Sequence, residues 1–197
     1  MTFLYRSHDV MKGIRELFST GKGRRVALVG FVGDGAEAYL PKPKSLELIC
    51  WPKAGGTNPK QIIALRKRGI KVQFASSLHM KVYWAEDKGA IITSANLSTN
   101  ALGAGDLKEV GVGLCDTDVD IDKLIEIANP REVTKAELTR LAVQHKAYWI
   151  KNPPHTVRNQ PDRFPDWVAN GQIEPWKLGL WWGEHYVLSN CHSGSDY

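Results

Sequence analysis

The sequence predicts an α/β fold in which a mixed β-sheet is sandwiched by helices, followed by a loop-rich C-terminal extension. Apolar residues along positions 1–150 switch repeatedly between the period of an amphipathic helix and that of a strand. From position 151 the chain becomes rich in proline and tryptophan, and that period is lost. A length of 197 residues suits one domain with a short appendage. We therefore expect a domain over 1–150 and an extension over 151–197.

The elements of the first half follow from local spacing. Apolar residues at positions 10, 14, 17 and 18 recur at helical intervals, and Gly21 is a natural stop after them. Positions 26–32 form a continuous apolar run, which is typical of a central strand buried on both faces. The alternation then predicts strands over 46–50 and 70–74, with a basic helix over 59–68 between them.

The second half continues the alternation of strands and helices. A strand that carries His79 and Lys81 is followed by one at Ile91 and by another over 109–114. Positions 118–128 have the spacing of an amphipathic helix. A last helix begins at Thr134, where Glu137 completes a capping box, and ends at 151–154.

Two charged or ionisable side chains alternate in the middle of the chain. On a strand, His79 and Lys81 project from one face while Met80 and Val82 project from the other. An imidazole and an ammonium are then held side by side. Taken alone, this short pattern is far more often the solvated face of an edge strand.

Small polar residues follow the next strand. Ser94 and Asn96 lie where that strand gives way to a loop, and Glu109 precedes another strand. Neutral donors beside Lys81 can hold an anion. In order and approximate spacing, His79, Lys81, Ser94, Asn96 and Glu109 resemble the signature of the phospholipase D superfamily. The resemblance spans roughly positions 24–127.

Two positions depart from the superfamily pattern. The aspartate of the spacer falls at Glu86, which keeps a carboxylate that we expect to support the site. The glycine before the serine is Thr93, which can alter how closely the backbone approaches a phosphate.

The resemblance implies a role for each motif residue. His79 is the nucleophile that attacks phosphorus and forms a phosphohistidine. Lys81 and Asn96 hold the non-bridging oxygens and stabilise the charge of the transition state. Ser94 fixes a histidine or a phosphate oxygen, and Glu109 orients His79 by accepting its other ring proton. These roles require no metal and no cofactor.

The motif occurs once, whereas the chemistry it implies needs two histidines. The resemblance therefore implies a homodimer with one shared site on its two-fold axis. Small single-motif members of the superfamily resemble nucleases, so we expect a metal-independent phosphodiesterase that cleaves nucleic acid, with DNA favoured over RNA. The alternatives are a phospholipase or phosphatidyl-transfer enzyme and a catalytically silent module that binds nucleic acid.

Composition agrees with these expectations without separating them. The net charge of +5 suits an anionic partner, although basic residues also serve solubility. The three cysteines are odd in number and have no Cys-x-x-Cys spacing. No apolar stretch approaches the length of a membrane span, and no export segment is visible. We expect a cytoplasmic protein that is not associated with a membrane.

A second motif would indicate a different function, the binding of a dinucleotide. Gly33, Gly35 and Ala38 match a loose dinucleotide fingerprint after the first apolar strand. Pro41 and Pro43 end the following helix after little more than one turn, which leaves a poor dipole for a pyrophosphate. A glycine turn that feeds a short helix is the simpler interpretation.

The extension contains many large aromatic residues, which disordered segments lack. One interpretation is a cap that packs on the domain or on the dimer interface. The other is a stacking platform for unpaired bases, with Trp181, Arg158 and Arg163 among its substrate-binding residues. Histidines at 155, 185 and 192 match no pattern of metal ligands.

Overall fold

The computed structural model describes residues 1–153 except 20–22, 41–44 and 104–106, and residues 179–180 and 186–187. The chain divides into two compact units, Met1–Pro153 and Pro154–Tyr197. In the second unit, strands β9 (Gly179–Leu180) and β10 (Tyr186–Val187) form an antiparallel pair. The rest of the extension lies outside the described residues, so the packing expected of it stays a prediction.

The first unit is built on an eight-stranded sheet in the order β1-β7-β6-β5-β2-β3-β4-β8. Strand β2 pairs in parallel with β3, and β3 with β4, whereas every other neighbouring pair is antiparallel. The predicted mixed sheet is confirmed. The strands are β1 (Thr2–Leu4), β2 (Arg25–Val29), β3 (Leu46–Cys50), β4 (Lys71–Phe74), β5 (Lys81–Ala85), β6 (Gly89–Thr93), β7 (Gly111–Leu114) and β8 (Arg131–Glu132).

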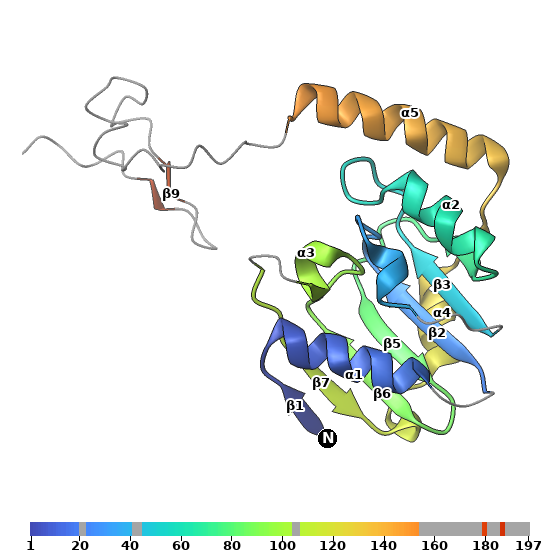
Figure 1. The fold of residues 1–197 in the computed structure, drawn as a ribbon, viewed down its shortest axis with the longest axis vertical. Coiled ribbons are helices and arrows are strands. Elements are labelled where there is room, and N and C mark those ends of the chain that lie inside the picture. The colour runs from blue at the N-terminus through green and yellow to red at the C-terminus, as the bar shows by residue number, and fades with distance from the viewer. Residues whose placement is uncertain (20–22, 41–44, 104–106, 154–178, 181–185, 188–197) are drawn as a thin grey trace, which may run out of the picture. The chain divides into compact units, whose positions relative to one another are not determined.

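Helices cover both faces of this sheet, as predicted. Side chains of α1, α2, α3 and α5 belong to the core on one face, and α4 packs on the opposite face. Figure 1 shows α1 in front of β5, β6 and β7, with α4 behind the sheet. The helices are α1 (Ser7–Ser19), α2 (Pro59–Lys67), α3 (Thr99–Leu102), α4 (Ile121–Ala128) and α5 (Lys135–Lys151).

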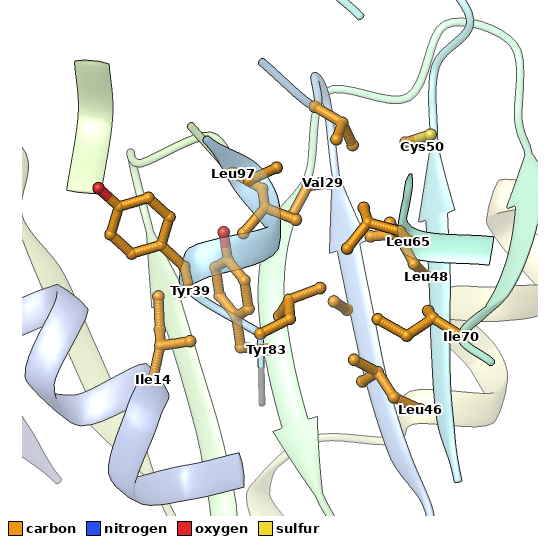
Figure 2. Packing of buried hydrophobic residues seen from close by; sticks show 14 of the residues in the cluster. Ile14, Val29, Tyr39, Leu46, Leu48, Cys50, Leu65, Ile70, Tyr83 and Leu97 are labelled. Carbon is orange, nitrogen blue, oxygen red and sulfur yellow. The ribbon is translucent and has the colours of Figure 1, made fainter. Parts of the chain in front are cut away.

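Strand β2 is fully buried, as its continuous apolar run predicts. Ala27 and Val29 point into the core beneath α1 and α2, while Val26 and Leu28 point into the core beneath α4. On the first face, Tyr83 of β5 lies among residues of α1 and of the loop after β6 (Figure 2). Its ring packs edge-on against Phe18 of α1.

Several boundaries differ from those that the sequence predicts. The strand expected to carry His79 begins only at Lys81, because the residues at 78–80 make no ladder hydrogen bonds. Strands β1 and β8 and helix α3 were not predicted, since each has four residues or fewer and too little pattern to detect. The expected stop at Gly21 lies outside the described residues.

Two local predictions are confirmed. Thr134 and Glu137 form the capping box of α5, and the backbone N–H of Thr134 holds the pKa of the Glu137 carboxyl below its ordinary value. The run that follows Gly33 contains a single 3₁₀ turn, Ala36–Ala38. A helix of one turn has little dipole for a pyrophosphate, which agrees with the simpler interpretation of that motif.

The double burial of the central strands predicts where substitutions destabilise the domain. Leu48 of β3 is fully buried in the core, so Leu48→Ala should lower the free energy of unfolding by about 2–5 kcal/mol through lost contacts and a cavity. Chemical denaturation measures this change. Ile127→Ala on the exposed side of α4 is the control and should change stability by less than about 0.5 kcal/mol. Equal effects of the two substitutions would contradict the layered core.

Candidate functional site

Strand direction brings distant segments to one edge of the sheet. Because β3 runs parallel to β2, the ends of both strands lie at the same edge. Strand β5 is antiparallel to β2 and to β6, so its beginning lies at that edge beside the end of β6. The beginning of β7 lies there as well. All five motif residues lie at or close to a strand terminus at this edge. His79 and Lys81 lie at the beginning of β5, Ser94 and Asn96 follow the end of β6, and Glu109 precedes β7.

Lys81 and His79 are in direct contact. The Lys81 ammonium donates to the backbone oxygen of His79 at 2.9 Å. The same Nζ lies 3.3 Å from Nδ1 and 3.0 Å from Nε2 of the His79 ring. The lone-pair directions of the two ring nitrogens diverge, so Nζ can align with at most one of them. The imidazole itself is exposed.

The Lys81 side chain is buried in spite of its charge. Only 8% of the residue is exposed, and this desolvation lowers the pKa of the ammonium, while the nearby carboxylate of Glu109 acts in the opposite direction. Glu109 is itself only 9% exposed. The site therefore has two buried charges of opposite sign beneath an exposed imidazole.

Ser94 and Glu109 form the other half of the site. The Ser94 hydroxyl donates to Oε2 of Glu109 and accepts from the backbone N–H of Val110 at 3.1 Å. The backbone N–H of Glu109 donates to the hydroxyl of Ser7 on α1 at 3.2 Å. In the described part of the chain the carboxylate accepts from Ser94 and not from His79, so the expected role in orienting the histidine stays a prediction.

Asn96 presents its amide as a donor. Its Oδ1 accepts from the backbone N–H of Phe31 at 3.0 Å. A backbone N–H can only donate, so the acceptor must be the amide oxygen, and Nδ2 keeps its two donors for another partner. Among the described residues no partner of Nδ2 is seen, and an amide donor of this kind can hold an anion.

Gly30 places Asn96 beside His79. A Cβ built on Gly30 would lie 3.1 Å from Oδ1 of Asn96 and 3.7 Å from Cα of His79. Both residues therefore border the space that this glycine leaves. Sequence reasoning missed Gly30 and the backbone of Phe31 as parts of the candidate site, since a glycine within an apolar run is taken as part of the strand.

The threonine that replaces the expected glycine, Thr93, is accommodated by hydrogen bonds to the neighbouring backbone. The Thr93 hydroxyl donates to the backbone oxygen of Val110 at 2.6 Å and accepts from the N–H of Ala95 at 3.1 Å. Thr93 is buried, and the register of β5 against β6 places it opposite Lys81, on the same face of the sheet. Gly111 stands directly opposite, where a Cβ would lie 3.1 Å from Cβ of Thr93.

The departure at Glu86 lies far from the site. Glu86 follows the last residue of β5, five residues beyond Lys81, which corresponds to about 17 Å along an extended strand. Its Oε2 accepts from the backbone N–H of Arg24 at 2.7 Å. The expectation that Glu86 supports the site is wrong, because its carboxylate supports the opposite edge of the sheet.

Three predicted substrate-binding residues, Arg158, Arg163 and Trp181, lie outside the described residues. Within the described residues, no group of three or more His, Cys, Asp or Glu side chains could hold a metal ion. None of the helices in that part of the chain has the length and apolar character needed to cross a membrane.

No protein-family model matches the sequence, and no curated protein matches it. Among solved structures, the chain resembles NucT from Helicobacter pylori with 15% identity and a TM-score of 0.49, over 73% of this chain and 95% of that one. It also resembles Nuc from Salmonella typhimurium, described as a phospholipase D family member, with 12% identity and a TM-score of 0.49. That match covers 68% of this chain and 97% of Nuc.

A third similar structure is phosphatidylserine synthase from Haemophilus influenzae Rd KW20, with 12% identity and a TM-score of 0.47, over 76% of this chain and 44% of that one. Likeness at these identities concerns the fold and not the activity.

The pair Thr93 and Gly111 yields a test of how the motif departure is tolerated. Gly111→Ala should destabilise the protein by about 1–3 kcal/mol, because the new Cβ crowds Thr93 and the backbone oxygen of Ile92. In a Thr93→Gly background the same change should cost less, with a coupling energy of about 0.5 kcal/mol or more in a double-mutant cycle measured by denaturation. Strict additivity would show that the two positions do not share the space.

Proposed function

We propose that the protein is a metal-independent phosphodiesterase of the phospholipase D type that cleaves nucleic acid, with DNA as its main substrate. One observation carries the proposal. His79, Lys81, Asn96 and the Ser94–Glu109 pair, from separate strands, border one another at a single edge of the sheet. A nucleophile, a cation and a neutral donor are what displacement at phosphorus requires.

In the proposed reaction, a neutral nitrogen of the His79 ring attacks phosphorus and forms an N–P bond as the bond to the leaving oxygen breaks. Lys81 and the Nδ2 donors of Asn96 bind the non-bridging oxygens, whose negative charge grows in the transition state. A phosphate oxygen competes with the ring for the Lys81 ammonium, which draws the cation away from the nucleophile. Water then attacks phosphorus, breaks the N–P bond and releases the product.

The leaving oxygen needs a proton, and the incoming water must lose one. A second imidazole can perform both transfers if it begins protonated. The described residues place one imidazole in this site, and the motif occurs once in the sequence. We propose that the second is the partner's His79 in a homodimer, on the opposite side of the phosphate.

An exposed apolar face supports a second copy. Phe3 pairs across the ladder with Val112, and Val112 pairs with Ile92, so the three side chains share one face of the sheet. Phe3 and Ile92 are exposed, as is Val110 next to Glu109. An exposed apolar patch that adjoins a functional site is typical of a protein interface.

Cations beside the site support a nucleic acid backbone as the ligand. A cavity of about 310 Å³ beside Glu109 is lined by Arg6, His8 and Lys108 on one side of the site. Lys53 lies beyond the ring of Phe31 on the other side. Cationic side chains on both flanks match a polymer that carries a phosphate at every residue.

The nucleophile is tested with single substitutions. His79→Ala should abolish cleavage of plasmid and single-stranded DNA, while Lys81→Ala and Asn96→Ala should lower turnover about a hundredfold or more. His79 is exposed, so its removal should leave the melting temperature unchanged. Val143→Ala is the surface control. Near wild-type cleavage by His79→Ala would exclude the phosphohistidine route.

The same assays separate the alternatives. Excess EDTA should leave cleavage unchanged, and a strict requirement for metal would contradict the scheme. Hydrolysis of phospholipid vesicles without cleavage of DNA or RNA would favour the phospholipase alternative. Tight binding of DNA without any turnover would favour the catalytically silent module.

The shared site is tested by mixing His79→Ala chains with wild-type chains and allowing the subunits to exchange. If two histidines act on one phosphate, heterodimers are inactive and activity falls as the square of the wild-type fraction. If each chain works alone, activity falls linearly. Analytical ultracentrifugation of the mixture gives the dimer fraction against which the two curves are compared.

A further inference from the structure

Aromatic side chains adjoin the proposed nucleophile on the β3 side of the site. Phe31 follows β2 and Trp51 follows β3, so both lie at the site edge of the sheet. Their rings are stacked, with centroids 5.7 Å apart and planes inclined by 23°. The Phe31 ring meets the His79 ring edge-on at 6.4 Å. Neither Phe31 nor Trp51 is fully buried.

The segment 51–57 that carries Trp51 is held in place by hydrogen bonds within the segment and to the loop after β2. The backbone N–H of Trp51 donates to the oxygen of Gly30 at 3.1 Å, and the fully buried Thr57 donates its hydroxyl to the oxygen of Trp51 at 2.6 Å. The Lys53 ammonium lies 4.6 Å from the centre of the Trp51 ring. The hydrogen bonds therefore fix the backbone that carries Trp51, and with it the position of the aromatic pair.

Two adjacent glycines of this segment each support an aromatic ring. A Cβ on Gly56 would lie 2.5 Å from the Phe31 ring, and a Cβ on Gly55 would lie 2.5 Å from the ring of Tyr148 on α5. Consecutive Cα atoms are about 3.8 Å apart, so both rings pack against the same short stretch of backbone. The glycine pair thus links the Phe31–Trp51 pair to the aromatic residues of helix α5.

Trp149 extends this surface along α5. Its ring meets that of Tyr148 at 5.2 Å and 90°, and its indole N–H donates to Nε2 of His145 at 3.0 Å. Tyr148 is 41% exposed and Trp149 is 40% exposed. Two large rings, one of them fixed by a hydrogen bond, therefore remain open to solvent on the described surface.

We propose that Phe31, Trp51, Tyr148 and Trp149, together called the aromatic strip, stack on unpaired bases of a single-stranded nucleic acid whose phosphate lies at His79. Stacking on aromatic rings is available to every base, and paired bases do not expose their faces. On binding, Lys53 leaves the Trp51 ring for a phosphate next to the stacked base, so that face of the ring is open to the base. The inference rests on the proposed phosphodiesterase site, and it names single strands as the substrate class.

The test measures binding in a His79→Ala background, where no strand is cut. Oligo-dT, an abasic strand of equal length and a duplex are compared by fluorescence anisotropy at one salt concentration. The intact strand should bind more tightly than the abasic strand by about 5- to 150-fold for each stacked base. Tyr148→Leu, Trp149→Leu and Trp51→Leu should each reduce that ratio and leave affinity for the abasic strand unchanged.

Val143→Leu is the matched control, because Val143 is 65% exposed on the same helix and lies away from the strip. It should leave the ratio unchanged. Equal affinity for intact and abasic strands, tighter binding of the duplex, or the same loss with Val143→Leu would each overturn the inference. Tyr148 and Trp149 are surface residues, so their variants decide the outcome even where Trp51→Leu impairs folding.

Cleavage by chains that keep His79 separates this inference from the proposed function. If intact strands bind more tightly than abasic strands but neither is cut, base stacking on the aromatic strip is supported and the nuclease proposal is contradicted. If both strands are cut at equal rates and bind with equal affinity, the nuclease proposal is supported and base stacking on the aromatic strip is contradicted. An oligo-U strand in the same series shows whether the stacked bases belong to RNA as well as to DNA.

Discussion

Strand β5 lies between β2 and β6 and runs antiparallel to both, and the site depends on that register. Lys81 faces Val29 across one ladder, and Val82 faces Ile92 across the other. A shift of one residue would send Lys81 to the opposite face of the sheet, because successive side chains alternate. The burial of β2 on both faces prevents such a shift, since apolar neighbours on each side fix its partners. The site is thus held by the core.

The buried charges are tolerated for an electrostatic reason. Desolvation penalises the ammonium of Lys81 and lowers its pKa, whereas Glu109 favours the charged form. Glu109 in turn accepts a hydrogen bond from Ser94, which lies at the surface. Removing either charge would leave the other buried without compensation. The arrangement is therefore costly for the fold, and its presence at the edge beside an exposed imidazole is typical of a functional site.

The motif residues could be predicted from the sequence because their chemistry is rare and their order is fixed, whereas their geometry could not. Alternation predicts that His79 and Lys81 lie together on one strand. In the structure the strand begins at Lys81, and the two residues meet because the Lys81 side chain folds back onto the ring and backbone of His79. The hydrogen bond from Phe31 to Asn96 spans segments 65 residues apart, and no local period reports such a contact. The position of Glu86 depends on the length of β5, and the spacing of residues in the motif does not give that length.

Phe31 contacts both the candidate site and the aromatic strip. Its backbone N–H fixes the amide of Asn96, and its ring contacts both His79 and Trp51. The ring itself rests on Gly56, where no side chain fits. A ligand that presses on the Phe31 ring therefore acts on the same residue that aims the Asn96 donor. If bases stack on this ring, occupation of the aromatic strip and alignment of the phosphate are coupled through one residue. Such coupling would let binding energy from a neighbouring base improve the geometry at phosphorus and raise turnover as well as affinity.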